Sequence, residues 1–166
     1  MNTGFSLTID PMIIQNHENS NLLGTEAYWW MGDELPMRTG QIPQGYITRP
    51  GYKMFNYNHH GIGHFSYGPY FDNTSLGQIN VYYFMDAVRR LGGKAFSVDI
   101  VDANDLEHPL TSATFTVNQL PRESSGFIVY VRGIRIKPGQ KLEFRVFAEG
   151  GSDLRLFMIR MERDAL

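Results

Sequence analysis

The sequence contains no cysteine, which excludes disulfide bonds, thiolate metal sites and cysteine nucleophiles. It also lacks an excess of either charge, because 15 lysines and arginines stand against 17 aspartates and glutamates, for a formal net charge of −2. No dense basic run could neutralise several phosphates, so we expect no nucleic-acid partner. No apolar run approaches the roughly 18 to 20 residues that a membrane helix requires, so we expect no membrane partner.

Motifs of common catalytic sites are also missing. There is no G-x-S-x-G nucleophile elbow and no HExxH zinc motif, and the glycine-rich stretch GIGHFSYG lacks the lysine and the following helix of a phosphate-binding loop. A carboxylate pair for glycoside hydrolysis could only be chosen arbitrarily from the 17 acidic residues. We therefore predict a protein that is not an enzyme, with no catalytic residue and no cofactor.

The first residues, MNTGFSLTIDP, have neither the positive n-region nor the apolar h-region of a secretory signal peptide. This start predicts synthesis in the cytoplasm without a signal peptide. The length of 166 residues suits one domain with a substantial core.

The chain divides into two parts of different composition. Glycine, proline and asparagine interrupt every apolar run in residues 1–50, and strand patterns are frequent in residues 51–166. We predict an extended, irregular N-terminal arm over 1–50 and a β-sandwich domain over 51–166.

Alternation of apolar and polar residues is the main strand signal. In AFSVDIVDAND and KLEFRVFAEGG, one face can be buried and the other solvated, and the residues expected inside are Phe96, Val98, Ile100, Leu142, Phe144 and Val146. Further strands are predicted in HFSYGPYF, INVYYFMDAV, TSATFTVNQLP, GFIVYVRGIRIKPGQ and SDLRLFMIRMERD. DAVRRLGG alone could form a helical turn, ended by Gly92 or Gly93. These strands predict an all-β, antiparallel β-sandwich, with a jelly roll as the leading variant.

The order HFSYGPYF, AFSVDIVD and LEFRVFAEGGSDLRLFMIRM resembles the order of elements in carbohydrate-binding-module-like jelly rolls. Capsid decoration (cement) proteins of tailed bacteriophages are similar in architecture, with sandwiches and extended arms. The resemblance covers none of residues 1–50. It implies a sandwich that binds either a glycan or neighbouring protein subunits.

Three histidines gather in NYNHHGIGHFSYGPYF, residues 56–71. His60 and His64 have the i, i+4 spacing that chelates zinc on a helix, but the intervening GIG opposes a helix. We predict a turn in which the imidazoles of His59, His60 and His64 bond to nearby backbone and bind no metal. The following Tyr67 and Tyr70 are expected to lead into or belong to an edge strand.

The stretch VDANDLEHP offers oxygen ligands that suit calcium, namely Asp102, Asn104, Asp105 and Glu107. It lacks the glycine of an EF-hand loop, and aspartate and asparagine are also the usual residues of tight turns. A turn is the favoured interpretation, and a structural calcium ion is the alternative.

The stretch AYWWMGDELP places Tyr28, Trp29 and Trp30 beside Asp33 and Glu34. Flat rings beside carboxylates are typical of sugar-binding surfaces. Adjacent rings in a strand point to opposite sides, however, so Trp29 and Trp30 cannot both stack on one ligand in a regular strand. The alternative is that one tryptophan anchors the N-terminal segment to the core and the other lies at a protein interface.

Two classes of function follow. The first is a structural protein of virion assembly: a capsid decoration protein, located in the virion, that forms a homo-oligomer such as a trimer and binds capsid subunits. Its arm would pack across a subunit boundary, and removing residues 1–21 would weaken assembly and leave the sandwich folded. The alternative is a carbohydrate-binding module that recognises a glycan through surface aromatics. The interface or ligand candidates are Phe5, Ile13, Ile14, Tyr28, Trp29, Trp30, Tyr67 and Tyr70.

Overall fold

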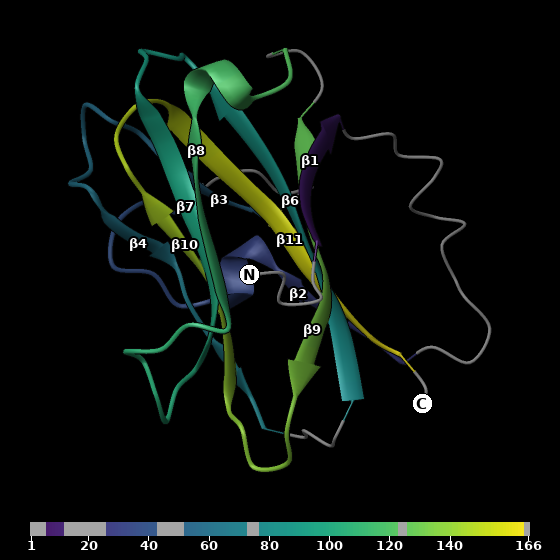
Figure 1. The fold of residues 1–166 in the computed structure, drawn as a ribbon. Helices are drawn as coiled ribbons and strands as arrows, with labels where there is room; N and C mark the ends of the chain where they lie inside the picture. Colours follow the sequence, from purple (N-terminus) through teal and green to yellow (C-terminus); the bar gives the residue numbers. More distant parts are fainter. Residues whose placement is uncertain (1–5, 12–25, 43–51, 73–76, 123–125, 165–166) are drawn as a thin grey trace.

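Two antiparallel sheets face each other in the computed structural model, which describes residues 6–11, 26–42, 52–72, 77–122 and 126–164 (Figure 1). The candidates Phe5, Ile13 and Ile14 lie outside these residues. In the described residues the only helical segments are the short 3-10 turns η1 (Gly32–Glu34) and η2 (Val117–Gln119). The prediction of an all-β antiparallel sandwich is confirmed.

The first sheet, sheet A, has the strand order β1-β9-β6-β11-β2, and β3 also pairs with β11. Its strands are β1 (Ser6–Pro11), β2 (Glu26–Met31), β3 (Lys53–Phe55), β6 (Gly77–Val88), β9 (Phe127–Ile136) and β11 (Asp153–Asp164). The second sheet, sheet B, has the order β4-β10-β7-β8, and β5 also pairs with β10. Its strands are β4 (Gly63–Ser66), β5 (Pro69–Phe71), β7 (Lys94–Asp102), β8 (Thr111–Thr116) and β10 (Leu142–Ala148).

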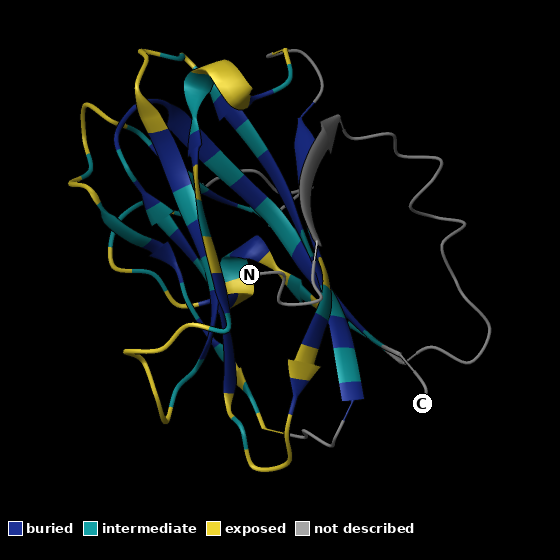
Figure 2. Ribbon diagram, in the orientation of Figure 1, coloured by how far each residue is buried: buried dark blue, intermediate teal, exposed yellow. Residues whose placement is uncertain are grey.

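The core lies between the sheets and follows the predicted alternation. The six residues expected inside β7 and β10 are all at most 1% exposed, and Figure 2 shows buried positions interspersed with intermediate ones along these strands. Sheet A contributes the inward residues of β6 and β9, among them Val81, Tyr83, Val129 and Val131. Both inner faces are therefore apolar, and their side chains fill the space between the two sheets.

In β11 the alternation changes direction once. Leu154 and Leu156 point into the core, but the register shifts between Leu156 and Met158. Beyond this irregularity, Ile159 and Met161 lie in the core. Uninterrupted alternation from Leu154 and Leu156 would have placed Met158 there instead. A bulge adds one residue to a strand and moves every later side chain to the other face.

The expectation of irregular structure in residues 1–50 needs correction at two places. Strand β1 pairs with β9, and strand β2 pairs with β11, so both are edge strands of sheet A. Six-residue runs between the glycines and prolines are long enough to form strands when a long central strand offers its free edge. Whether this segment also contacts another subunit stays a prediction.

The helical turn expected in DAVRRLGG is also corrected. Residues Asp86 to Val88 complete β6 and pair with β11, up to Val88 opposite Asp153. The chain then turns through Arg89, Gly92 and Gly93, all at positive φ. Extended pairing to β11 outweighs the local helix preference of this short run.

A lysine is buried beside the core and joins three segments. Lys53 of β3 has no exposed surface, and its Nζ donates to the backbone oxygens of Leu35 (2.6 Å) and Pro36 (3.1 Å) and to Ser66 Oγ (3.3 Å). Burial lowers the pKa of Lys53 to about 8, and the charge of Asp33 only partly opposes this. Lys53 thereby fixes the segment after η1 against β4.

This buried amine predicts a pH-dependent stability. The folded protein releases the Lys53 proton near pH 8, and the unfolded chain releases it near pH 10.5. The stabilising contribution of the neutral amine is therefore fully present above pH 10.5 and is lost as the pH falls through 8. We expect the free energy of unfolding to rise by about 1 to 2 kcal/mol between pH 8 and 9.5 through this group. Urea unfolding of the native protein and of Lys53→Met at several pH values would measure the difference. An equal rise in Lys53→Met would contradict the assignment.

Candidate functional site

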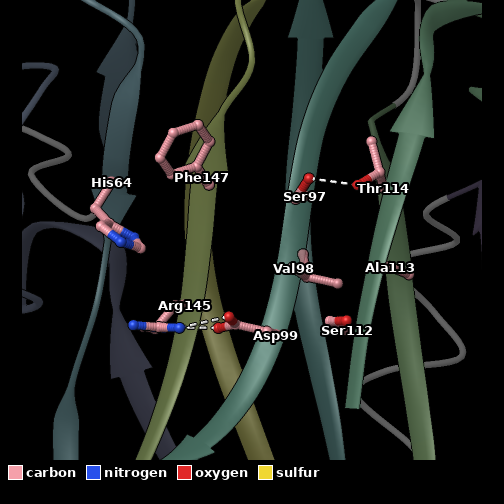
Figure 3. A pocket seen from close by; sticks show the side chains of 9 residues that line it. All are labelled: His64, Ser97, Val98, Asp99, Ser112, Ala113, Thr114, Arg145 and Phe147. Carbon is pink, nitrogen blue, oxygen red and sulfur yellow. Dashed lines mark hydrogen bonds and ion pairs between the residues drawn. The ribbon is translucent and has the colours of Figure 1, made fainter. Parts of the chain in front are cut away.

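The outer face of sheet B, which faces away from the core, carries a row of side chains across four strands. His64 of β4 lies opposite Phe147 of β10, Phe147 opposite Ser97 of β7, and Ser97 opposite Thr114 of β8. Figure 3 shows the two rings on one side of this row and the two hydroxyl side chains on the other. The strand register therefore brings together residues that are far apart in the sequence.

A second row holds a charge pair. Arg145 lies opposite Asp99, and Asp99 lies opposite Ser112. Arg145 donates from Nε to Asp99 Oδ1 (2.8 Å) and from a terminal nitrogen to Oδ2 (2.6 Å), the bidentate geometry drawn in Figure 3. The hydrogen bond to Asp99 raises the pKa of Arg145. Both groups are thus held in a fixed orientation with polar atoms still facing solvent.

These rows border a hollow of about 240 Å³. Its walls are His64, Ser97, Val98, Asp99, Ser112, Ala113, Thr114, Arg145 and Phe147. A second hollow of about 410 Å³ is lined by Arg38, Thr39, Gly61, Ile62, Gly63, His64 and Phe147. Since His64 and Phe147 line both, the hollows adjoin at this ring pair, and together they are called the sheet B groove below.

His64 and Phe147 form the ring pair in the middle of the groove. Their centroids are 5.2 Å apart and their planes are perpendicular. Burial, and then the charge of Arg145, lower the pKa of His64, so the imidazole is neutral near pH 7. Its Nδ1 is buried and makes no hydrogen bond within the described residues. The groove therefore contains two rings packed edge to face, and the Nδ1 atom itself is not exposed to it.

The opposite wall of the groove is made of hydroxyls. Ser97 Oγ lies 2.7 Å from Thr114 Oγ1, and it donates to Glu149 Oε1 at 2.8 Å. Because the side chains of Ser97 and Thr114 are short, the groove stays open between the two rings and β8. The wall offers oxygen atoms that can both donate and accept hydrogen bonds.

The segment after η1 forms the other end of the groove. The backbone nitrogens of Arg38 and Thr39 donate to the His64 oxygen at 3.0 and 3.2 Å, which attaches this segment to the edge of β4. Lys53 holds the same segment through Pro36, as described above. Arg38 is exposed and places a cationic side chain on the wall of the second hollow.

The predicted histidine turn is confirmed at His60. The nitrogens of His59 and His60 donate to the Asn56 oxygen, and His60 Nδ1 accepts from the Asn56 nitrogen at 2.8 Å. His64 lies in β4 and faces the groove instead. Among the residues that the structure describes, no group of three or more metal-ligating side chains is present.

The predicted turn in VDANDLEHP is also confirmed. Asp102 Oδ1 accepts from the backbone nitrogens of Asn104 (3.0 Å) and Lys141 (3.1 Å), and the Asp105 nitrogen donates to the Asp102 oxygen. The Asp102 carboxylate, the first of the candidate calcium ligands, thus stabilises the turn through these hydrogen bonds.

The two tryptophans point to opposite sides of sheet A, as their spacing predicted. Trp30 packs on the core against Phe71 and Phe144, with centroids 6.0 and 5.7 Å away. It therefore has the anchoring role that the sequence offered as the alternative to ligand binding. Trp29 is 48% exposed on the outer face of sheet A, where the guanidinium of Arg160 lies 4.6 Å from its ring.

The other aromatic candidates also divide between the sheets. Tyr28 packs on the core against Phe71 at 4.8 Å. Tyr67 lies between β4 and β5, and its nitrogen donates to the Pro36 oxygen. Tyr70 lies in β5 and is 42% exposed. The predicted edge strand around these tyrosines is therefore real, but it is split into β4 and β5.

Of the residues that line the first hollow, sequence reasoning singled out only His64 as a candidate metal ligand, and it interpreted His64 as part of a turn. One signal was available in β10, where Glu143, Arg145 and Phe147 share the outward parity of the strand. A phenylalanine on an otherwise polar face has no core to fill, which suggests a ligand or partner. Its neighbours across the sheet could not be named, because they depend on register.

Comparison with known proteins bears on the fold. No protein-family model and no curated protein matches the chain in sequence. A carbohydrate-binding module, CBM6cm-2 of Cellvibrio mixtus lichenase 5A, solved with cellotriose, matches with a TM-score of 0.51 and 15% identity, over 83% of this chain and 98% of the module. The C-terminal CBM6 of the laminarinase LamC from Zobellia galactanivorans matches with a TM-score of 0.42 and 14% identity, over 82% and 98%.

A third solved structure is dimeric latent PorU from Porphyromonas gingivalis, with a TM-score of 0.42 and 12% identity, over 84% of this chain and 12% of PorU. The first match shows a β-sandwich of the carbohydrate-binding-module type. This match is to a carbohydrate-binding module and gives no support to the expected role in a virion. The described part of the chain contains no helix long and apolar enough to cross a membrane.

Proposed function

We propose that this protein is a carbohydrate-binding domain without catalytic activity, and that the sheet B groove is its glycan site. One observation carries this proposal: the ring of Phe147 lies in a hollow beside a preformed Arg145–Asp99 pair. The glycan function, stated above as the alternative, is thus favoured over capsid decoration. The binding residues differ from the surface aromatics that the sequence suggested.

The chemistry of the groove suits a sugar ring. A pyranose has apolar C–H groups that stack on an aromatic face and hydroxyls that both donate and accept. Phe147 offers the face, the Arg145 guanidinium donates, and the Asp99 carboxylate accepts. Because the charged pair is already oriented by its two hydrogen bonds, little side-chain entropy is lost when a ligand binds.

The carboxylate content of the first hollow supports binding without hydrolysis. Hydrolysis of a glycosidic bond ordinarily requires two carboxylates on either side of the scissile bond. Asp99 is the one carboxylate among the described residues that line this hollow, and both its oxygens accept from Arg145. We expect no release of reducing ends from oligosaccharides incubated with the protein. The fold shared with a module that was solved with cellotriose also supports the proposal.

The central test is the replacement of Phe147 by alanine. Loss of the stacking face should weaken oligosaccharide binding about tenfold or more. Isothermal titration with cello-, xylo-, manno- and laminari-oligosaccharides would measure the affinity. Leu106→Ala is the matched control, because it also truncates a large hydrophobic side chain, and Leu106 is 50% exposed and lines neither hollow.

Two results would contradict the proposal. One is that no oligosaccharide binds the native protein. The other is that Phe147→Ala, with an unchanged unfolding temperature, binds as tightly as Leu106→Ala. In either case the expected role in assembly, tested by sedimentation of the native protein, would become the better hypothesis.

A further inference from the structure

Tyr70 is an aromatic residue beside the sheet B groove that lines neither hollow. It belongs to β5, which pairs with the end of β10 where Leu142 lies opposite Phe71. Phe71 packs into the core against Tyr28 and Trp30. Tyr70 is the extra residue of an irregularity in this pairing, because Glu143 lies opposite Pro69 and Leu142 lies opposite Phe71, and it is 42% exposed.

The backbone of Tyr70 is held in a conformation that tyrosine disfavours. Its φ is 64°, in the left-handed region where a bulky side chain is an outlier. Such a residue persists only where its surroundings hold it, and strained residues concentrate at binding and catalytic sites. A glycine would occupy this position without strain. The presence of tyrosine here therefore points to a function of its side chain.

A buried carboxylate joins Tyr70 to the groove. Glu143 lies on the same outward side of β10 as Arg145 and Phe147, is only 5% exposed, and accepts from the Gly68 nitrogen at 3.2 Å. Burial, and then the charge of Glu143, raise the pKa of Tyr70. Glu143 is two residues from Arg145 in β10 and lies opposite Pro69, the residue before Tyr70, so it links the groove to Tyr70 along the strand.

We propose that the glycan site extends along β10 to Tyr70, and that the ring of Tyr70 is a second stacking surface for a linear oligosaccharide. This inference rests on the proposed function. Phe147 and Glu143 are four positions apart in β10, which is about 13 Å in a strand. One sugar ring is too short for this span, so the ligand class is an oligosaccharide whose units bind at Phe147, over Arg145 and Glu143, and at Tyr70.

The test uses oligosaccharides of one to about six units in the four series named above, titrated against the native protein, Tyr70→Phe and Tyr70→Gly. Tyr70→Gly removes the ring and relieves the positive φ, so it should keep its unfolding temperature. We expect it to bind the longest oligosaccharides about five- to tenfold more weakly and to bind the shortest ligands as the native protein does. Tyr70→Phe keeps the ring and should retain most of the affinity.

The outcomes separate the two hypotheses. If no oligosaccharide binds the native protein, the proposed function fails and this inference fails with it. If Phe147→Ala loses binding but Tyr70→Gly binds long ligands normally, only the extension to Tyr70 is overturned. Equal losses for short and long ligands in Tyr70→Gly, or an equal loss in Tyr70→Phe, would also overturn the second stacking surface.

Discussion

Replacing Glu162 by leucine is expected to lower the free energy of unfolding by about 3 to 5 kcal/mol, because the change removes one partner of a buried ion pair. Glu162 accepts from Arg160 at 2.8 Å, and the side chains of Arg160 and Glu162 are only 4% and 3% exposed. The other oxygen of Glu162 accepts from the Tyr82 hydroxyl at 2.8 Å. Leucine would leave the guanidinium without this carboxylate and the hydroxyl without this acceptor.

The ion pair lies within an ordered row on the outer face of sheet A. Arg160 lies opposite Trp29 on one side and opposite Tyr82 on the other, and Tyr82 lies opposite Tyr130. Arg160 packs on the Trp29 ring, and Tyr82 meets Tyr130 edge to face at 5.2 Å. The carboxylate of Glu162 therefore neutralises a cation that is set among aromatic rings.

A double variant provides the control for Glu162→Leu. Arg160→Met combined with Glu162→Leu removes both charges and should recover most of the lost stability, since an apolar pair of similar volume can replace a buried ion pair. Urea unfolding followed by tryptophan fluorescence would compare the three proteins. A loss below about 1 kcal/mol in the single variant would show that the pair behaves as a surface ion pair.

Replacing Gly32 by alanine is expected to cost at least about 3 kcal/mol of stability, at the upper end of overpacking. A β-carbon at this position would lie 2.0 Å from the Leu156 oxygen and 3.1 Å from the Lys53 nitrogen. Both contacts are with backbone atoms, and Leu156 pairs with Met85 on one side and with Lys53 on the other. Because neither neighbouring strand can move alone, the clash would displace η1 and the Lys53 hydrogen bonds beyond it.

Gly61→Ala is the matched control for this prediction. A β-carbon at Gly61 would meet no atom within 4 Å, and its φ does not lie in the left-handed region. Thermal unfolding of Gly32→Ala and Gly61→Ala would therefore separate the clash from the general effect of adding a methyl group. If both variants unfold at the same temperature, the close packing of η1 on β11 is not a determinant of stability.

The strands with clear alternation could be predicted from the sequence, because alternation is a local property of the pleated backbone. Phe96, Val98 and Ile100 are buried where the pattern placed them, and Ser97 and Asp99 face outward. The same pattern failed in β11 after Leu156, where a bulge inverts the parity. A bulge is formed by pairing with a neighbouring strand, so no pattern within β11 announces it.

The edge strands in residues 1–50 were missed for a related reason. Strands β1 and β2 are short, and they lie among glycines and prolines that usually mark loops. They form strands because β9 and β11 leave free backbone donors and acceptors at the two edges of sheet A. The requirement to pair a strand edge comes from the whole sheet and is absent from the local sequence.

The sequence by itself determined the all-β class, the inward residues of β7 and β10, and the turns at His60 and Asp102. Only the tertiary structure decided the sheet B groove, because His64, Phe147, Ser97 and Thr114 come from four strands and meet through register. A shift of one residue in any of these strands would turn its side chain into the core. Residue type and spacing thus fix which positions face outward, and the long-range pairing of strands fixes which of them lie side by side.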